Sequence, residues 1–140
     1  MTTGVEINNY FKNNKLARIM VVDDEKDILR IIKRDLENTN EFQVEVFSSA
    51  VDALTAFKNH DLNYYDVIIT DIRMPRMNGF ELYRHIKEMS PNTKIAFITA
   101  FEINKDEFIK VLPSIEVKDF VIKPIDMDDL VFKIKSMLSM

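Results

Sequence analysis

The stretch Ile69-Thr70-Asp71-Ile72-Arg73-Met74-Pro75 places a carboxylate directly after an apolar run. Two other stretches have the same pattern, with charged residues after apolar, mostly β-branched residues: Val21-Val22-Asp23-Asp24-Glu25 and Val121-Ile122-Lys123-Pro124. Such runs are typical of buried strands, so the charged residues are expected at strand ends. In an open parallel sheet the carboxyl ends of the strands face the ligand crevice, so these charges would meet at one edge.

The charged residues in these stretches suit one kind of chemistry. Asp23, Asp24 and Asp71 would repel one another if packed together, and a divalent cation with oxygen ligands relieves that repulsion. Lys123 adds a point charge that suits phosphate. The residues therefore predict a Mg²⁺-dependent phosphoryl site. Each motif taken alone has a plainer interpretation; residues 23–25, for example, could simply be acids at the start of a helix.

The rest of the chain alternates between strand-like and helix-like patterns. Apolar strand patterns cover residues 17–22, 43–47, 67–70, 94–99 and 120–122. Helical periodicity covers residues 25–38, 50–57 after a cap at Ser48 or Ser49, 82–89, weakly 107–112, and 130–137 after a cap at Asp126. Five strands that alternate with five helices predict an α/β protein with a doubly wound parallel sheet.

The composition excludes several classes of protein. The 140 residues suffice for one domain, which we place at residues 16–140, after an N-terminal extension at 1–15 that is expected to be mobile. The net charge of −4 and the lack of a long basic run argue against direct binding of nucleic acid. The chain has no cysteine, which excludes disulfides and thiolate zinc sites and fits the cytoplasm. No signal peptide or membrane-spanning stretch is apparent.

Four motifs at the predicted strand ends carry a family resemblance. They are Asp23-Asp24, the run Asp71-Ile72-Arg73-Met74-Pro75-Arg76-Met77-Asn78-Gly79, Thr99-Ala100, and Lys123-Pro124. In this order and at these spacings the chain resembles the receiver domain of two-component response regulators, of the single-domain chemotaxis and sporulation type. The resemblance covers about residues 16–139 and implies a flavodoxin-like sheet of five strands in the order 2-1-3-4-5.

The resemblance assigns metal and acceptor roles to the acidic residues. It implies that Asp71 is the phosphoacceptor, whose carboxylate attacks the phosphorus of a donor in line to give an acyl phosphate. Asp24, Asp71 and the backbone carbonyl of Arg73 would bind Mg²⁺ directly, and Asp23 would act mainly through a metal-bound water. Mn²⁺ could take the place of Mg²⁺.

The resemblance also supplies groups for the transferred phosphoryl. Lys123 would pair with a phosphoryl oxygen, and with Asp71 at rest. The hydroxyl of Thr99 would bind a second oxygen once phosphate arrives. The backbone N–H groups of Ile72 and Ala100 are expected to be further donors.

The family couples phosphorylation to a surface change through a Thr and an aromatic residue. The corresponding residues here are Thr99 and Phe120, and inward movement of Thr99 would let Phe120 turn in. The face formed by the predicted helix at 107–112, the fifth strand and the last helix would then change its affinity for a partner. Plain core packing remains an alternative role for Phe120. Many receivers have Tyr at this position, so any readout through that hydroxyl is absent here.

Two features depart from the common family pattern. The segment before the fifth strand carries Leu112-Pro113-Ser114-Ile115 in place of a Gly-Ala pair, which indicates a short or irregular helix. Arg73 lies two residues after Asp71, and Phe101 lies two after Thr99, so both are expected at the rim of the site. We expect them to shield the acyl phosphate from water and lengthen its life.

The resemblance implies signalling partners rather than substrates. A histidine kinase or phosphotransfer protein would donate the phosphoryl group, and an unknown downstream protein would read the result. The protein is expected to be cytoplasmic, without direct contact to nucleic acid or membrane, and a monomer or a phosphorylation-dependent dimer. It would catalyse only its own phosphorylation and slow dephosphorylation. Because no linker follows Leu138-Ser139-Met140, a stand-alone protein is slightly favoured over a piece of a longer regulator.

Two other functions stay open as alternatives. A Mg²⁺-dependent phosphohydrolase with an Asp nucleophile also places Asp after a strand, but the haloacid-dehalogenase pattern needs a second Asp where this chain has Arg73. A phosphorylation-independent interaction module could keep the same fold. For that module, partner binding would survive the substitution Asp71→Asn.

Overall fold

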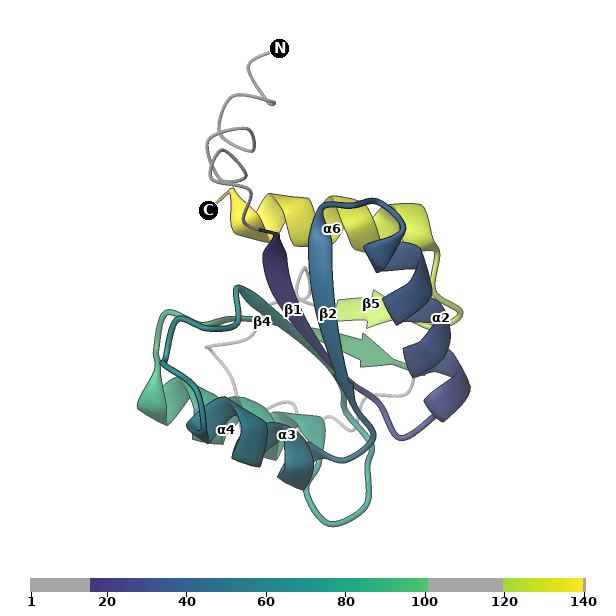
Figure 1. The fold of residues 1–140 in the computed structure, drawn as a ribbon. Coiled ribbons are helices and arrows are strands. Elements are labelled where there is room, and N and C mark those ends of the chain that lie inside the picture. Colours follow the sequence, from purple (N-terminus) through teal and green to yellow (C-terminus); the bar gives the residue numbers. More distant parts are fainter. Residues whose placement is uncertain (1–15, 101–119, 140) are drawn as a thin grey trace.

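The computed structural model describes residues 16–100 and 120–139, which form a three-layer α/β fold around a parallel sheet (Figure 1). The five strands run in the order β2-β1-β3-β4-β5, and each neighbouring pair is parallel. In chain order the elements are β1 Ala17–Val22, α2 Lys26–Glu37, β2 Phe42–Phe47, α3 Ala50–Lys58, β3 Val67–Asp71, α4 Gly79–Met89, β4 Lys94–Thr99, β5 Phe120–Ile122 and α6 Met127–Leu138. The predicted flavodoxin-like, doubly wound sheet is thereby confirmed.

Most element bounds lie close to those predicted from the sequence. Helix α2 covers Lys26–Glu37 where the pattern predicts 25–38, and strand β3 continues one residue further, to Asp71. Four helices lie in the described part of the chain. The fifth predicted helix, at 107–112, and the predicted extension at 1–15 lie outside the described residues. No helix among the described residues combines the length and the apolarity needed to span a bilayer.

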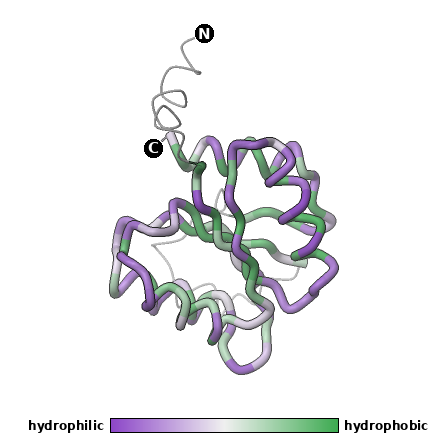
Figure 2. The backbone as a smooth tube through the Cα atoms, in the orientation of Figure 1, coloured by the Kyte–Doolittle hydropathy of each residue, from purple (hydrophilic) through white to green (hydrophobic). Residues whose placement is uncertain are grey.

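Helices cover both faces of the sheet. Helices α2 and α6 pack on one face, and α3 and α4 pack on the other (Figure 1). Within β1, Ile19 and Val21 point to the first face, while Met20 and Val22 point to the second. The central strands are therefore apolar at nearly every position, as the green core of Figure 2 shows, and this explains why they read as continuous apolar runs rather than alternating ones.

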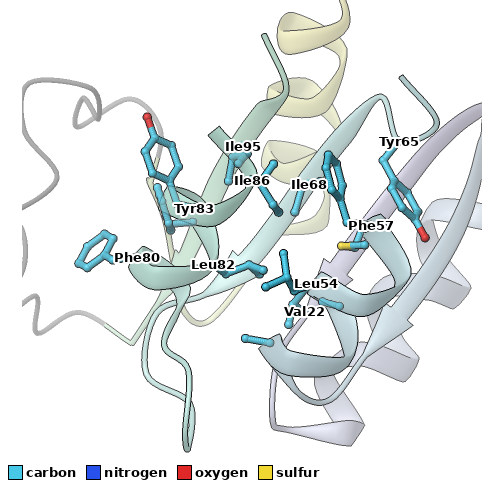
Figure 3. Packing of buried hydrophobic residues seen from close by; sticks show 14 of the residues in the cluster. Val22, Leu54, Phe57, Tyr65, Ile68, Phe80, Leu82, Tyr83, Ile86 and Ile95 are labelled. Atoms are coloured by element: carbon cyan, nitrogen blue, oxygen red, sulfur yellow. The ribbon is translucent and has the colours of Figure 1, made fainter. Parts of the chain in front are cut away.

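The packing between β3 and its covering helices fixes the strand that ends in Asp71. Leu54 of α3 and Leu82 and Ile86 of α4 gather with Ile68 of β3 in one buried cluster (Figure 3). Burial of a side chain of this size contributes about 1.5–3 kcal/mol. All five residues of β3 are buried, so the carboxyl end of this strand is held firmly.

Side-chain caps start three of the helices. The side chain of Ser49 accepts a hydrogen bond from the backbone N–H of Asp52, and that of Asp126 accepts from the first turn of α6, as the sequence predicts. Asn78 and Glu81 form a reciprocal capping box at the start of α4. These caps satisfy backbone donors that would otherwise lack partners.

Gly79 makes the loop after β3 fold closely against the strand end. Its backbone N–H donates to the carbonyl of Ile72 at 2.8 Å. A Cβ atom at this position would lie 2.1 Å from the backbone oxygen of Asp71, far inside van der Waals contact. Glycine is therefore required here by close approach of the backbone.

Side chains of α2 occupy the outer edge of the sheet at β2. Lys33 Nζ donates to the carbonyl of Val44 at 2.6 Å, and the backbone N–H of Val44 donates to Glu37 Oε2 at 3.1 Å. The two side chains also pair with each other at 3.1 Å. Unpaired backbone groups on a sheet edge can pair with a strand of another chain. At Val44 the side chains of Lys33 and Glu37 occupy both the carbonyl and the N–H group.

We expect Gly79→Ala to destabilise the protein by roughly 1–3 kcal/mol, because the new Cβ would displace the backbone of the strand end. Helix propensity alone would favour Ala by about 1 kcal/mol, so the sign of the effect separates the two causes. Urea unfolding measures it, with Arg84→Ala on the exposed face of the same helix as the control. A variant as stable as the wild type would contradict the close approach.

Candidate functional site

The charged residues singled out in the sequence converge at one edge of the sheet. Asp23 directly follows β1, Asp71 is the last residue of β3, and Lys123 directly follows β5. One carboxylate oxygen from each of Asp23, Asp24 and Asp71 lies within 4.8 Å of the others. Parallel strands bring their carboxyl ends to the same edge, so the topology itself assembles this group.

The three carboxylates differ in how firmly they are held. Asp23 is fully buried, and its Oδ1 accepts a hydrogen bond from the backbone N–H of Glu25 at 2.8 Å. Asp71 is 7% exposed, and its Oδ1 accepts from the backbone N–H of Ile72 at 2.8 Å. Asp24, by contrast, is exposed to solvent. Two acids are thus fixed by the backbone, while the third can adapt to a ligand.

Lys123 lies among three carboxylates. Its Nζ is 2.8 Å from Glu25 Oε1, 3.0 Å from Asp23 Oδ2 and 3.6 Å from Asp71 Oδ2. The backbone N–H of Lys123 donates to the carbonyl of Thr99 at 2.8 Å, which ties the end of β5 to the end of β4. The prediction that Lys123 pairs with Asp71 at rest is thus incomplete, because Glu25 and Asp23 lie closer to the ammonium.

Glu25 is the site residue that the sequence did not single out for a role. It follows the acidic pair directly, and the sequence suggests for it only the plainer alternative of an acid at a helix start, where the helix dipole favours it. It does sit just before α2, but its side chain turns to Lys123, which is 98 positions away in the sequence. The only sequence feature that could have drawn attention to Glu25 is its place as a third acid beside the acidic pair. That feature does not indicate which residue its side chain contacts.

Burial and crowding raise the pKa values of the acids. Burial raises the pKa of Asp71 to about 6, and the charge of Asp23 adds to the rise, while Lys123 and the Ile72 N–H oppose it. The pKa of Asp23 is also raised, mainly by burial. Burial acts to lower the pKa of Lys123, but the hydrogen bond that its ammonium donates to Glu25 and the nearby charges of Asp23 and Asp71 prevail, so that pKa is raised. Above about pH 6, the ionised carboxylate of Asp71 therefore lowers the stability of the metal-free folded protein.

The donor set fits a hard divalent cation such as Mg²⁺. All the clustered side-chain donors are carboxylate oxygens, which Mg²⁺ prefers. Among the described residues, the buried Oδ2 of Asp23 meets no hydrogen-bond donor in good geometry, although Lys123 Nζ lies nearby. A metal ion or its bound water would satisfy this oxygen and offset the repulsion between Asp23 and Asp71.

An open cleft of about 490 Å³ lies over these groups. The residues that line it are Asp24, Glu25, Asp71, Arg73, Thr99, Ala100 and Lys123. Most of the predicted acceptor, metal and phosphate residues therefore share one cavity. Thr99 is 5% exposed and Arg73 lies at the exposed rim. The predicted rim residue Phe101 lies outside the described residues.

The predicted backbone donor Ile72 already has a partner. Its N–H donates to Asp71 Oδ1, so it would bind a phosphoryl oxygen only after that bond rearranges. Ile72 and Arg73 also line a smaller hollow beside the cleft, formed with Met74, Pro75 and Asn78 of the loop after β3. Ala100, by contrast, lies directly on the main cleft.

The two predicted switch residues lie on neighbouring strands. Phe120 of β5 pairs in register with Phe97 of β4, and their rings stack with centroids 5.4 Å apart. Thr99 lies two residues further along β4. Phe97 also contacts Phe80 of α4, with centroids 5.2 Å apart. Phe120 is thus half-buried beside the core; its role as a switch stays a prediction.

Comparison with known proteins gives a consistent result. A family model for the response regulator receiver domain matches residues 19–135. The response regulator ArlR of Staphylococcus aureus is 31% identical over 124 residues, which cover 88% of this chain and 53% of that protein. This chain therefore spans about half the length of the curated relatives it matches.

Solved structures show the same similarity. A response regulator receiver domain protein from Clostridium thermocellum is 31% identical with a TM-score of 0.73, covering 88% of this chain and 94% of that one. A CheY-like receiver domain protein from Methanospirillum hungatei is 28% identical with a TM-score of 0.76, covering 89% and 94%. The response regulator TrrA of Thermotoga maritima, solved in complex with Mg²⁺-BeF, is 28% identical with a TM-score of 0.71, covering 88% and 100%.

We expect Asp71→Asn to stabilise the metal-free protein at pH 7.5 by roughly 1–3 kcal/mol, because it removes a charge that burial disfavours. The pKa of Asp71 is raised from 3.8 to about 6 in the folded protein, so its unfavourable contribution develops as pH rises through that window. The gain should therefore vanish below about pH 4.

Urea unfolding with a chelator, repeated between pH 4 and 8, measures this difference. Asp61→Asn, which neutralises an exposed carboxylate in the loop after α3, serves as the control and should show no such pH-dependent gain. If Asp71→Asn were less stable than the wild type at pH 7.5, the described balance of charges would be wrong.

Proposed function

This chain belongs to the response regulator receiver domain family, and from that premise we propose that it is a phosphorylation-activated signalling switch with Asp71 as its phosphoacceptor. One observation carries the assignment. Asp71 is fixed at the end of a fully buried strand, yet it lines the open cleft together with Asp24 and Lys123. A donor can therefore reach the carboxylate, and the groups needed to bind a phosphoryl group surround it.

The transfer step follows from the position of Asp71. A carboxylate oxygen of Asp71 attacks the phosphorus, so an oxygen–phosphorus bond forms while the bond from phosphorus to the donor's leaving group breaks. The leaving group departs with the bonding electrons and takes up a proton from water. Asp71 must be ionised to attack, and its pKa of about 6 leaves it mostly ionised at neutral pH.

Neighbouring residues in the cleft stabilise the transferred group. Lys123 gives up part of its carboxylate pairing and places its ammonium against a phosphoryl oxygen. The hydroxyl of Thr99 and the N–H of Ala100 donate to further oxygens, and Ile72 joins them if its bond to Asp71 rearranges. These donors act where negative charge is already disfavoured by burial, so each interaction is stronger than in water.

Asp24, Asp71 and the backbone carbonyl of Arg73 would hold Mg²⁺ directly, and Asp23 would hold it through a water. When bound, the cation supplies neutralisation of the carboxylate and phosphoryl charges. Mn²⁺ has the same preference for oxygen ligands and would substitute for it. The related regulator of Thermotoga maritima, crystallised with Mg²⁺-BeF, supports this choice of metal.

The response to phosphorylation involves β4, which is adjacent to the acceptor strand, and β5, which pairs with β4. Phosphorylation draws Thr99 toward the phosphoryl group and lets Phe120 turn inward, which alters the surface made by β5, α6 and the predicted helix at 107–112. A histidine kinase or phosphotransfer protein supplies the phosphoryl group, and an unknown protein reads the altered surface. The protein acts in the cytoplasm as a monomer or as a phosphorylation-dependent dimer, without contacting nucleic acid or membrane. Its catalysis is limited to its own phosphorylation and slow dephosphorylation.

We expect acetyl phosphate with Mg²⁺ to add one phosphoryl group to the wild-type protein, because the small donor fits the open cleft. Intact-mass analysis measures the adduct. Asp71→Asn and chelator treatment should abolish labelling, whereas Asp61→Asn should keep it. Absence of an adduct on the folded wild-type protein, under conditions that label a known receiver domain, would contradict the assignment.

We further propose that Arg73 and Phe101 shield the acyl phosphate from water. The acyl phosphate of the double variant Arg73→Ala with Phe101→Ala should then hydrolyse faster than that of the wild type. The half-life is followed by intact mass after the donor is removed, with Arg84→Ala as a control for loss of a cation elsewhere on the surface. An unchanged hydrolysis rate in the double variant would contradict the shielding role.

A further inference from the structure

We propose that Glu25 is a positioning residue that holds Lys123 in the resting site and must release it before a phosphoryl group is bound. This inference rests on the proposed function and adds a residue that controls the rate at which Asp71 is phosphorylated. Glu25 would then set how readily the protein accepts a phosphoryl group and would favour the unphosphorylated form.

The contacts of Lys123 carry the inference. Its Nζ lies 2.8 Å from Glu25 Oε1 but 3.6 Å from Asp71 Oδ2, so the lysine is closest to a residue that is not the acceptor. Its side chain is 12% exposed, whereas that of Glu25 is 59% exposed. The lysine is thus confined within the site, and the glutamate reaches it from the solvent side.

Hydrogen bonds fix the backbone of Glu25 next to the site. Its backbone N–H donates to Asp23 Oδ1 at 2.8 Å, and its carbonyl accepts from the N–H groups of Ile28 and Leu29 at 3.1 and 3.2 Å. It occupies the N-cap position of α2, yet its side chain makes no capping hydrogen bond. Because the backbone is fixed on both sides, the carboxylate can leave or rejoin Lys123 by side-chain rotation alone.

The donor capacity of Lys123 explains why release is needed. An ammonium group has three N–H donors, and in the resting site it faces the carboxylates of Asp23, Glu25 and Asp71. An incoming phosphoryl oxygen needs one of these donors. Asp23 is buried, so without the ammonium its negative charge would lack a nearby positive charge. Asp71 is the acceptor itself. Glu25 can be hydrated once it is released, so it is the partner that leaves at the lowest cost.

The decisive experiment compares labelling rates with acetyl phosphate and saturating Mg²⁺, followed by intact mass. We expect Glu25→Gln to accept the phosphoryl group about two- to fivefold faster than the wild type, the size expected for loss of a partly exposed ion pair. Glu25→Ala, which also removes the hydrogen-bond acceptor, should be accelerated at least as much.

The matched control is Asp27→Asn. It removes one negative charge from the first turn of the same helix, but Asp27 pairs with Arg30 rather than with Lys123. It should label at the wild-type rate. Equal acceleration in Asp27→Asn and Glu25→Gln would mean that general charge near the cleft, and not the contact to Lys123, sets the rate, and would overturn the inference.

A second readout needs neither metal nor phosphoryl donor. The ¹⁵N and ¹H signals of the Lys123 ammonium in the metal-free protein should shift in Glu25→Gln and stay in place in Asp27→Asn. An unchanged labelling rate in Glu25→Gln, or an unchanged Lys123 signal, would overturn the inference. Absence of labelling in the wild type would instead overturn the proposed function, and the ammonium signal would still decide whether Glu25 holds Lys123.

Discussion

Repulsion between carboxylates at the carboxyl edge of the sheet is the constraint around which this molecule is organised. Asp23 and Asp71 are buried side by side at the ends of two adjacent strands, and burial raises the pKa of both. Backbone hydrogen bonds keep them in place although their charges oppose each other. A site with this excess of negative charge binds cationic groups favourably, because they reduce the repulsion between the carboxylates. Lys123 does so in part, and a divalent cation would do so more fully.

The apolar layers supply the stability that holds these charges together. Strand β3 is buried at every position and is covered by helices on both faces, so its terminal residue cannot retreat from its neighbours. Gly79 adds a second restraint because the loop after β3 packs directly on the backbone of Asp71. Rigid elements with functional groups at their ends give a site whose geometry survives a change in its charge.

The lysine comes from a less buried part of the sheet than the acids. Strand β5 has three residues, none of them fully buried, and it pairs with the rest of the sheet only through β4. Phe120 begins this strand against Phe97, and Lys123 follows it. Lys123 is therefore attached to a short strand near the surface rather than to the central core.

Local patterns in the sequence were sufficient for the strands, for caps such as Ser49 and Asp126, and for the gathering of acids at strand ends. Each of these depends on side-chain period or on a charge that ends an apolar run. Tertiary structure alone decided that Asp23 is fully buried while the adjacent Asp24 is exposed, and that Glu25 reaches Lys123 from 98 positions away. Sequence period specifies which face a residue occupies, but burial depth and ion pairing depend on which distant strands become neighbours.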